Sequence, residues 1–270
     1  MKNSKIHPAS GIYLALVMLF LYLPIIMLIV LSFNGTNSTS VIQGFSTKWY
    51  VELFKDSATI TALTNTLILA VTSAITATVI GTLAAVGIDK MKKGVVKSSV
   101  MTVTNIPMMN PEIVTGVSLM LLFVFFAARM NFEFGFVTLI IAHITFDVPY
   151  VILNIMPKFR QMNPHLYEAA QDLGCSPVSA FFKVVLPEIL PGVISGFLMS
   201  FTFSLDDFVI SYFTSGATSQ TLPITIYSMT RRKVSPEINA LSTIIFVIVV
   251  IVLVVKNVIE RRNAVKRGVK

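Results

Sequence analysis

The sequence has few charged residues, one cysteine and one tryptophan. Only 13% of its 270 residues are Asp, Glu, Lys or Arg, whereas 54% are hydrophobic. Because an average soluble domain carries about twice that share of charge, the composition excludes an ordinary soluble protein and indicates an integral membrane protein. The single cysteine, Cys175, excludes an internal disulfide, and no group of Cys and His residues accompanies it to bind a metal.

Six predominantly apolar runs are each long enough to cross a bilayer as a helix, which takes about 20 residues. They cover residues 11–33, 60–88, 100–128, 134–156, 189–213 and 238–259. The first run is longer than the apolar core of a signal peptide, and we expect it to be retained. The runs lack the alternation of a membrane β-barrel. We therefore predict an all-α membrane protein with six transmembrane helices, forming one domain over residues 1–270.

Basic residues are distributed unevenly between the predicted loops. With the N-terminus in the cytoplasm, fifteen of the 21 Lys and Arg residues lie on the cytoplasmic side. The positive-inside rule then places both termini in the cytoplasm. Because the basic clusters separate apolar runs instead of covering one solvated face, the net charge of +8 indicates contact with membrane lipid and not with nucleic acid.

The loop between the fourth and fifth runs, residues 157–187, has the signals of two short amphipathic helices. Asn163 followed by Pro164 is typical of a helix start, and Gly174 is suited to end that helix in the left-handed conformation. Ser176 with Pro177 then starts a second helix. Because the apolar face of such a loop would otherwise be exposed to water, we expect it to dock onto another protein.

The sequence EAAQDLGCSPVSAFFKVVLP within this loop resembles the EAA loop of permease subunits of ATP-binding-cassette importers. The matching positions are Glu168, Ala169, Ala170, Gly174, Phe182, Leu186 and Pro187. The resemblance implies that the first short helix is a coupling helix seated in a cytoplasmic ATPase subunit, which would bind ATP and Mg. The chain has no phosphate-binding GxxxxGK[ST] motif of its own, and no cofactor is expected in it. For Glu168 the alternative is an acid that only favours its helix dipole.

Four acids lie inside the predicted spans: Glu112, Asp147, Asp206 and Asp207. An acid near the centre of a membrane helix costs about 2.5–3.5 kcal/mol on insertion scales. No Lys or Arg lies at comparable depth in these spans, so a neighbouring subunit or the transported solute must supply the positive charge. We expect the four acids to line the pathway of a cationic solute.

Adjacent helical residues point about 100° apart, so Asp206 and Asp207 cannot both face one point. We expect one to face the pathway and the other to pack against or cap a neighbour. Ser204 adds a hydroxyl to this pathway, unless it bonds back to its own helix. His143, four residues before Asp147, either orients that acid or shares a proton with it, or else packs in the core.

Two further features bear on the pathway. Pro107, Pro111 and Pro149 are expected to interrupt the helices beside Glu112 and Asp147, which is tolerated where the backbone lines a cavity. Trp49 lies on the outer side before the second run. Its ring would either bind an ammonium group of the solute or anchor the chain at the membrane interface.

Segments along the whole chain resemble the second permease subunit of spermidine/putrescine importers: TKWYVELF, MNPEIVTGVSLMLLF, SLDDFVISYF, TLPITIYSM and VSPEINALSTII. The resemblance implies a non-enzymatic subunit in the bacterial inner membrane that imports polyamines by alternating access. It implies a heterodimer with a second permease, two ATPase subunits and an extracytoplasmic polyamine-binding protein. Spaced carboxylates suit the ammonium groups of a polyamine, but they do not rank spermidine against putrescine.

Three alternatives stay open from the residues alone. The first is a related importer for another small cation or metabolite. The second is a proton-coupled polyamine carrier that uses Asp147 or the Asp206–Asp207 pair, although the docking loop and the lack of an inverted repeat count against it. The third is an intramembrane aspartyl protease with Asp147 and Asp206 as its dyad, but the Gly-x-Gly-Asp context of such enzymes is absent.

Overall fold

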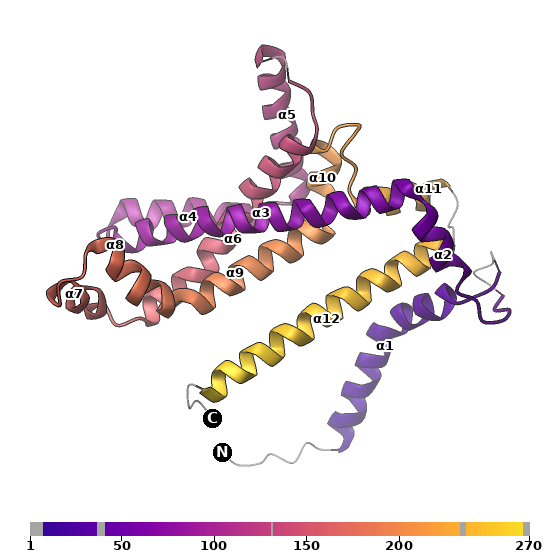
Figure 1. Cartoon of the computed structure of the whole chain (residues 1–270), viewed down its shortest axis with the longest axis horizontal. Coiled ribbons are helices and arrows are strands. Elements are labelled where there is room, and N and C mark those ends of the chain that lie inside the picture. The colour runs from indigo at the N-terminus through magenta and orange to yellow at the C-terminus, as the bar shows by residue number, and fades with distance from the viewer. Residues whose placement is uncertain (1–7, 37–40, 131, 233–235, 267–270) are drawn as a thin grey trace. The chain divides into compact units, whose positions relative to one another are not determined.

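The computed structural model describes residues 8–36, 41–130, 132–232 and 236–266 (Figure 1). Helices make up most of this described part, which contains no strand apart from an isolated bridge between Asn34 and Phe45. The predicted all-α fold class is confirmed. The chain divides into two compact units, one of Thr61–Thr225 and one of Met1–Ile60 with Ile226–Lys270. One domain over the whole chain stays a prediction.

The unit that holds both ends of the chain contains three helices. They are α1 (Pro8–Ser32), α2 (Lys48–Lys55) and α12 (Pro236–Lys266). Both α1 and α2 pack against α12. Residues 1–7 and 267–270, whose charges contribute to the predicted cytoplasmic location of the termini, lie outside the described residues.

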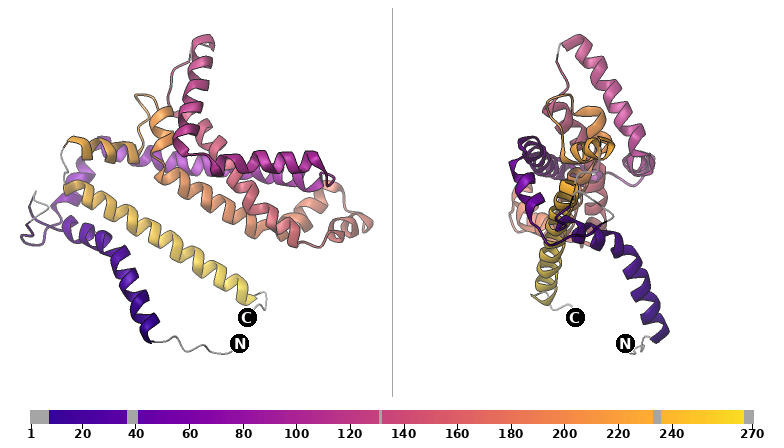
Figure 2. Two further views of the ribbon diagram at one scale, coloured as in Figure 1. Left: turned by 180° about the vertical axis from the view of Figure 1, so that it is seen from behind. Right: turned by 90° about the vertical axis from the view of Figure 1, so that its right-hand side faces the viewer.

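The unit Thr61–Thr225 contains the helices that carry the four predicted pathway acids. Its elements are α3 (Ser57–Lys90), α4 (Val95–Met109), α5 (Glu112–Met130), α6 (Phe136–Gln161), α7 (His165–Asp172), α8 (Pro177–Ala180), the π-helical segment η1 (Phe181–Val185), α9 (Leu186–Asp206), α10 (Val209–Thr214) and the start of α11 (Leu222–Arg232). Figures 1 and 2 show α3, α4, α6 and α9 running alongside one another, while α5 turns away from α4 toward α10.

Five described helical runs are long and apolar enough to cross a membrane: Ser10–Ser32, Ser57–Lys90, Glu112–Met130, Phe136–Gln161 and Pro177–Asp206. Pro236–Ile251, within the sixth predicted span, is a shorter apolar helix. The chain is therefore a multi-pass membrane protein, and the sixth crossing stays a prediction.

The third and fifth predicted spans are not continuous helices. The third breaks between α4 and α5, where Asn110 is extended with ψ at 133° because a residue before proline, here Pro111, is disfavoured in the helical conformation. The fifth breaks between α9 and α10, where Asp207 is extended with ψ at 123°. Our expectation that Pro107 and Pro149 interrupt helices is wrong, since both lie inside helices. A proline removes one backbone donor, and the rest of the helix can continue around it.

Close packing holds α6 between α3 and α9. Val151 of α6 touches the backbone of both neighbours at Gly81 of α3 and Gly196 of α9. Such small residues let helix backbones approach in a membrane, where lipid offers no hydrophobic driving force for association. Around them a buried cluster includes Ile152, Ile155 and Ile189. The acids on α6 and α9 are therefore carried by helices in direct contact.

The predicted helix–turn–helix differs from the structure in two ways. The first helix, α7, starts one residue later than expected, and the Asn163 side chain accepts a hydrogen bond from the N–H of His165 at 3.0 Å. The second helix does not end at Leu186 but continues through α8 and η1 into α9. Residues Pro177–Asp206 thus form one run of 30 residues, about 45 Å long at 1.5 Å per residue.

Candidate solute pathway and docking loop

Asp206 and Glu112 are the two predicted pathway acids whose side chains are exposed. Asp206 is the last residue of α9, and Glu112 is the first residue of α5. The two helix breaks lie close together because α5 packs on α10, where Gly116 contacts the backbone at Ile210. Within the described residues neither acid forms an ion pair with Lys or Arg.

Three aromatic side chains of α6 and α9 form a cluster. The rings of Tyr150 and Phe203 meet edge to face with centroids 4.8 Å apart, and Phe146 lies 5.2 Å from Tyr150. Tyr150 is half-buried and lies one helical turn after Asp147 on α6. Acids with adjacent aromatic faces offer a cation both charge and ring contacts.

Asp147 and Ser204 belong to a buried polar cluster. The hydroxyl of Ser204 donates to Oδ2 of Asp147 at 2.8 Å, and it also lies 2.9 Å from the hydroxyl of Ser73 on α3. Asp147 is 0% exposed, and its Oδ1 has no hydrogen-bond partner among the described residues. His143 contacts Ser204 through Nδ1 at 3.1 Å, so Ser204 bridges the histidine and the acid. No hydrogen bond among the described residues joins His143 to Asp147, so the alternatives in which His143 directly orients this acid or shares a proton with it have no direct contact to support them.

Asp207 is buried and uses both carboxylate oxygens on α10. Its Oδ1 accepts from the N–H of Ile210 at 3.2 Å, and its Oδ2 accepts from the N–H of Ser211 at 2.7 Å. These bonds satisfy backbone donors that a helix start leaves unpaired. Of the two adjacent aspartates, Asp207 therefore has the capping role, and Asp206 is the exposed one.

Trp49 lies in the other unit, on α2, and is only 4% exposed. Its indole N–H donates to the carbonyl of Asn34 at 2.5 Å. The side chain of Asn34 in turn donates to the carbonyl of Val41 and accepts from the N–H of Gln43. Trp49 thus packs against the end of the loop that follows α1, and a contact between its ring and a solute stays a prediction.

The turn between α7 and α8 has the geometry that the sequence predicted. Gly174 has φ of +85°, which favours glycine, and its N–H and that of Cys175 donate to the carbonyls of Gln171 and Ala170. The hydroxyl of Ser176 accepts from the N–H of Ser179 at the start of α8. These local bonds fix the turn that joins the two helices.

The loop presents an apolar surface with acidic and small residues on α7. Leu173, Val178 and Phe182 are 87%, 67% and 60% exposed. Glu168 and Ala169 are exposed and Ala170 is buried, so the three residues of the EAA motif do not share one face. The carboxylate of Glu168 lies 3.3 Å from Nδ1 of His165.

The base of α7 is anchored to the end of α3. The Nζ of Lys90 lies 4.7 Å from the ring centroid of Tyr167, within the range of a cation–π contact. Beside this contact is a cavity of about 210 Å³ whose lining includes Asp89, Phe159 and Glu168. A movement of α7 would therefore displace α3 through the contact of Lys90 with Tyr167, as well as α9 through α8 and η1.

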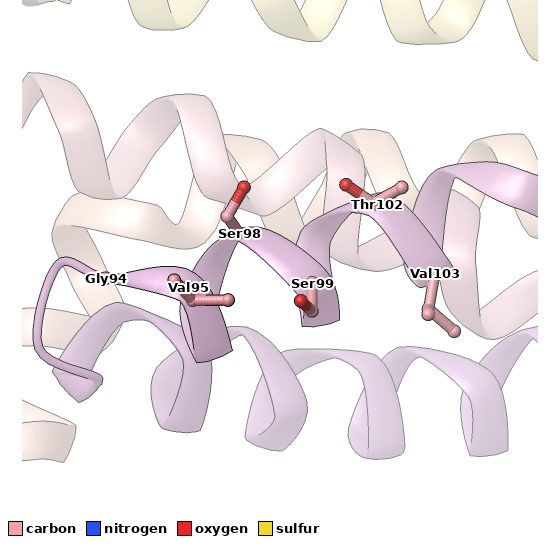
Figure 3. Close-up of a pocket in the computed structure, with 6 residues that line it drawn as sticks. All are labelled: Gly94, Val95, Ser98, Ser99, Thr102 and Val103. Carbon is pink, nitrogen blue, oxygen red and sulfur yellow. The ribbon is translucent and has the colours of Figure 1, made fainter.

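A separate hollow on α4 differs from the candidate pathway in its chemistry. Figure 3 shows it lined by Gly94, Val95, Ser98, Ser99, Thr102 and Val103. The hydroxyls of Ser98 and Thr102 lie on one side of the helix, one turn apart. Because this hollow has neither a carboxylate nor an aromatic ring, it lacks the groups that would bind an ammonium ion.

The structure brings together Asp147, Ser204 and Asp207 in the interior, and it leaves Asp206 and Glu112 exposed in the same unit. Sequence reasoning missed Ser73, Tyr150 and Phe203. The signal for Tyr150 was its spacing of three residues from Asp147, which puts both on neighbouring positions of one helix. Ser73 lies in a run rich in Ser, Thr and Ala, and no local pattern distinguishes it.

The family model for the binding-protein-dependent transport system inner membrane component matches residues 77–263. Among curated proteins, the chain is 40% identical over 228 residues to the putrescine transport system permease protein PotI of Escherichia coli K12, covering 84% of this chain and 81% of PotI. It is 38% identical over 252 residues to the spermidine/putrescine transport system permease protein PotC of Haemophilus influenzae, covering 93% and 96%.

A solved structure has a similar fold. The crystal structure of a bacterial ABC transporter involved in the import of the acidic polysaccharide alginate matches with a TM-score of 0.69 and 14% identity, over 93% of this chain and 94% of that chain. At this identity the match supports the fold alone. The residues matched by the family model include α6, the docking loop and α9. The chain belongs to the family of binding-protein-dependent transport system inner membrane components, which are transport subunits and not enzymes.

Proposed function

We propose that this chain is a permease subunit that imports polyamines into the cytoplasm by ATP-driven alternating access. The solute class comes from the relatives, one named for putrescine and one for spermidine and putrescine. The observation in the molecule that carries the proposal is that Asp206 and Glu112 are exposed at neighbouring helix breaks, without a Lys or Arg partner in the described part of the chain. A solute with several ammonium groups supplies the missing charge.

The proposed site residues have different roles. Asp206 and Glu112 contact the ammonium groups of the solute, and Tyr150 and Phe203 face its methylene carbons and charges. Asp147, Ser204 and Asp207 are buried, so they act on the pathway by holding α6, α9 and α10 in place. Trp49 is also buried, and it contributes through the loop that it stabilises.

Coupling to ATP is proposed to pass through α7. This helix, with Glu168, Ala169, Ala170 and Gly174, would sit in a groove of an ATPase subunit that binds ATP and Mg. Since α8, η1 and α9 form one helical run, a displacement at Pro177 is transmitted to Asp206 at its other end. A second permease would complete the pathway as a heterodimer, with two ATPase subunits below and a polyamine-binding protein above.

We further propose that both termini face the cytoplasm of a bacterium. Fifteen of the 21 Lys and Arg residues then lie on the cytoplasmic side, in accord with the positive-inside rule. The contact of Lys90 with Tyr167 supports this orientation, because it joins the end of α3 to the docking loop on one side of the membrane. An inside-negative potential favours entry of a cation by roughly 2.3 kcal/mol per charge per 100 mV.

The test is uptake into liposomes that contain this chain with its candidate partner permease and ATPase. Labelled spermidine and putrescine are supplied with the binding protein, and ATP is present inside, withheld or replaced by a non-hydrolysable analogue. We expect uptake only with ATP and the binding protein. Uptake driven by a pH gradient without ATP would overturn the proposal in favour of a proton-coupled carrier. ATP-dependent uptake of another solute, with neither polyamine taken up, would overturn the solute assignment.

A further inference from the structure

His143 is the centre of a buried cluster that joins four helices. It is 0% exposed, and its two ring nitrogens contact different elements. Nδ1 lies 3.1 Å from the hydroxyl of Ser204 on α9, which in turn contacts Ser73 on α3 and Asp147 on α6. Nε2 lies 3.1 Å from the hydroxyl of Ser211 on α10 and 3.5 Å from Oδ2 of Asp207 at the helix break.

The hydrogen atoms of the cluster limit the state of the imidazole. Ser204 has one hydroxyl hydrogen, and it donates that hydrogen to Oδ2 of Asp147. Nδ1 of His143 must then carry a hydrogen and donate it to the Ser204 oxygen. Nε2 either accepts from the Ser211 hydroxyl or, in a charged ring, donates toward Asp207. In both states Nε2 contacts a residue at the break between α9 and α10, either Ser211 or Asp207.

The break determines where the exposed carboxylate lies. Asp207 is extended and directs both of its oxygens to the first N–H groups of α10, so α9 ends at Asp206. If Asp207 were instead helical, the two acids would be successive positions of one continuous helix. The position of the Asp206 side chain relative to α10 and α5 therefore depends on an arrangement that the buried His143 and Asp207 maintain.

We propose that His143 and Asp207 form a positioning pair that fixes the α9–α10 break and thereby sets where Asp206 lies relative to α10 and α5. Neither member of the pair touches the solute. The Nε2 side of His143 is the important one, because it contacts both Asp207 and Ser211 across the break. The relevance of the pair to transport rests on the proposed function of Asp206. The contacts that hold the break are independent of that proposal.

The test measures the position of residue 206 directly. The chain has one cysteine, so a Cys175→Ser background makes Asp206→Cys the only thiol of this chain, and labelling is read on this subunit after the subunits are separated. The complex with its partner permease and ATPase is purified, and the rate of reaction of residue 206 with a cationic methanethiosulfonate reagent is recorded. Three variants of His143 are compared in this background. His143→Leu removes both nitrogens, whereas His143→Gln keeps a polar group near Nε2 and His143→Asn keeps one near Nδ1.

The expected order separates positioning from general packing. His143→Gln reacts within about twofold of the parent, whereas His143→Asn and His143→Leu change the rate at least fivefold. A double variant His143→Asn with Asp207→Asn changes the rate no more than the larger single effect, because the two residues act as one unit. Equal rates in the parent, His143→Asn and His143→Leu would overturn the proposal, as would rescue by Asn instead of Gln.

Two further outcomes are informative. Failure of all three variants to assemble, His143→Gln included, also overturns it, because His143 would then be a general requirement for folding. Spermidine uptake by the same His143 variants with Asp206 retained is measured separately. If labelling of residue 206 follows the expected order and uptake with Asp206 in place stays at the parent's rate, the positioning pair stands and the proposed solute role of Asp206 fails.

Discussion

A β-carbon on Gly81 of α3 would lie 2.7 Å from Cβ of Val151 on α6, closer than two carbon atoms can pack. Gly81→Ala should therefore push the two helices apart, at a cost of about 1–3 kcal/mol for overpacking. We expect a lower unfolding temperature of the purified protein in detergent, followed by intrinsic fluorescence, and a lower yield of assembled complex.

Gly87 is the matched control, since it lies on the same helix and a β-carbon there meets nothing within 4 Å. Gly87→Ala should unfold at the temperature of the parent or above it, because alanine favours a helix. Adding Val151→Ala to Gly81→Ala should recover part of the loss. Equal unfolding temperatures for the two alanine variants would contradict the close contact.

The parts of the structure that the sequence predicted depend on local chemistry. Gly174 at the end of α7, Ser176 and Pro177 at the start of α8, and the break before Pro111 each follow from residues within one turn. The apolar runs gave the all-α class for the same reason, because a helix in lipid satisfies its own backbone.

What the sequence could not predict depends on contacts between distant residues. The break at Asp207 follows no Pro or Gly, and it is held by His143, 64 residues earlier in the chain. Because no Pro or Gly marks this break, the sequence predicted one continuous helix over residues 189–213. The continuity of α8 with α9 was missed because Leu186-Pro187 suggested an end, although the run continues through the π-helical segment η1 and past both Pro187 and Pro191, as helices inside a membrane can do.

Loss of charge at the exposed acids should impair uptake. Asp206→Asn and Glu112→Gln each remove a charged partner of an ammonium group, worth about 1.5–3 kcal/mol for a charged hydrogen bond. In proteoliposomes we expect initial rates of spermidine uptake to fall about tenfold or more at equal amounts of assembled complex. Glu133→Gln is the control, since Glu133 is exposed in the turn between α5 and α6.

Stimulation of ATPase activity by the loaded binding protein distinguishes two causes for such a loss. This stimulation should persist in Asp206→Asn and in Glu112→Gln if the docking loop is intact. Normal uptake by both Asp206→Asn and Glu112→Gln would remove these acids from the pathway.

The left-handed turn at Gly174 should be sensitive to substitution. Its φ of +85° disfavours a side chain, and a β-carbon there meets nothing within 4 Å, so the effect is one of backbone conformation alone. Gly174→Ala should cost about 1–2 kcal/mol and disturb the angle between α7 and α8, whereas Gly174→Asn should cost less. We expect less ATPase bound per permease in pull-down measurements, in the order Ala below Asn below parent.

Gly94 provides the control for this position. It also has open space around a β-carbon, but its φ of 168° is extended backbone that any residue adopts. Gly94→Ala should bind the ATPase as the parent does. An equal loss for Gly94→Ala and Gly174→Ala would show that the turn conformation is not what the docking loop requires.

Trp49 tests whether a buried aromatic residue acts on the solute or on the fold. Trp49→Phe removes the buried hydrogen bond from the indole to the carbonyl of Asn34, and the loss of such a bond costs about 0.5–1.5 kcal/mol. We expect a lower unfolding temperature, with spermidine uptake per assembled complex within twofold of the parent. Phe54→Leu is the control, because Phe54 lies on the same helix and is 64% exposed. A variant Trp49→Phe with unchanged stability and reduced uptake would instead mean that the indole contacts the polyamine.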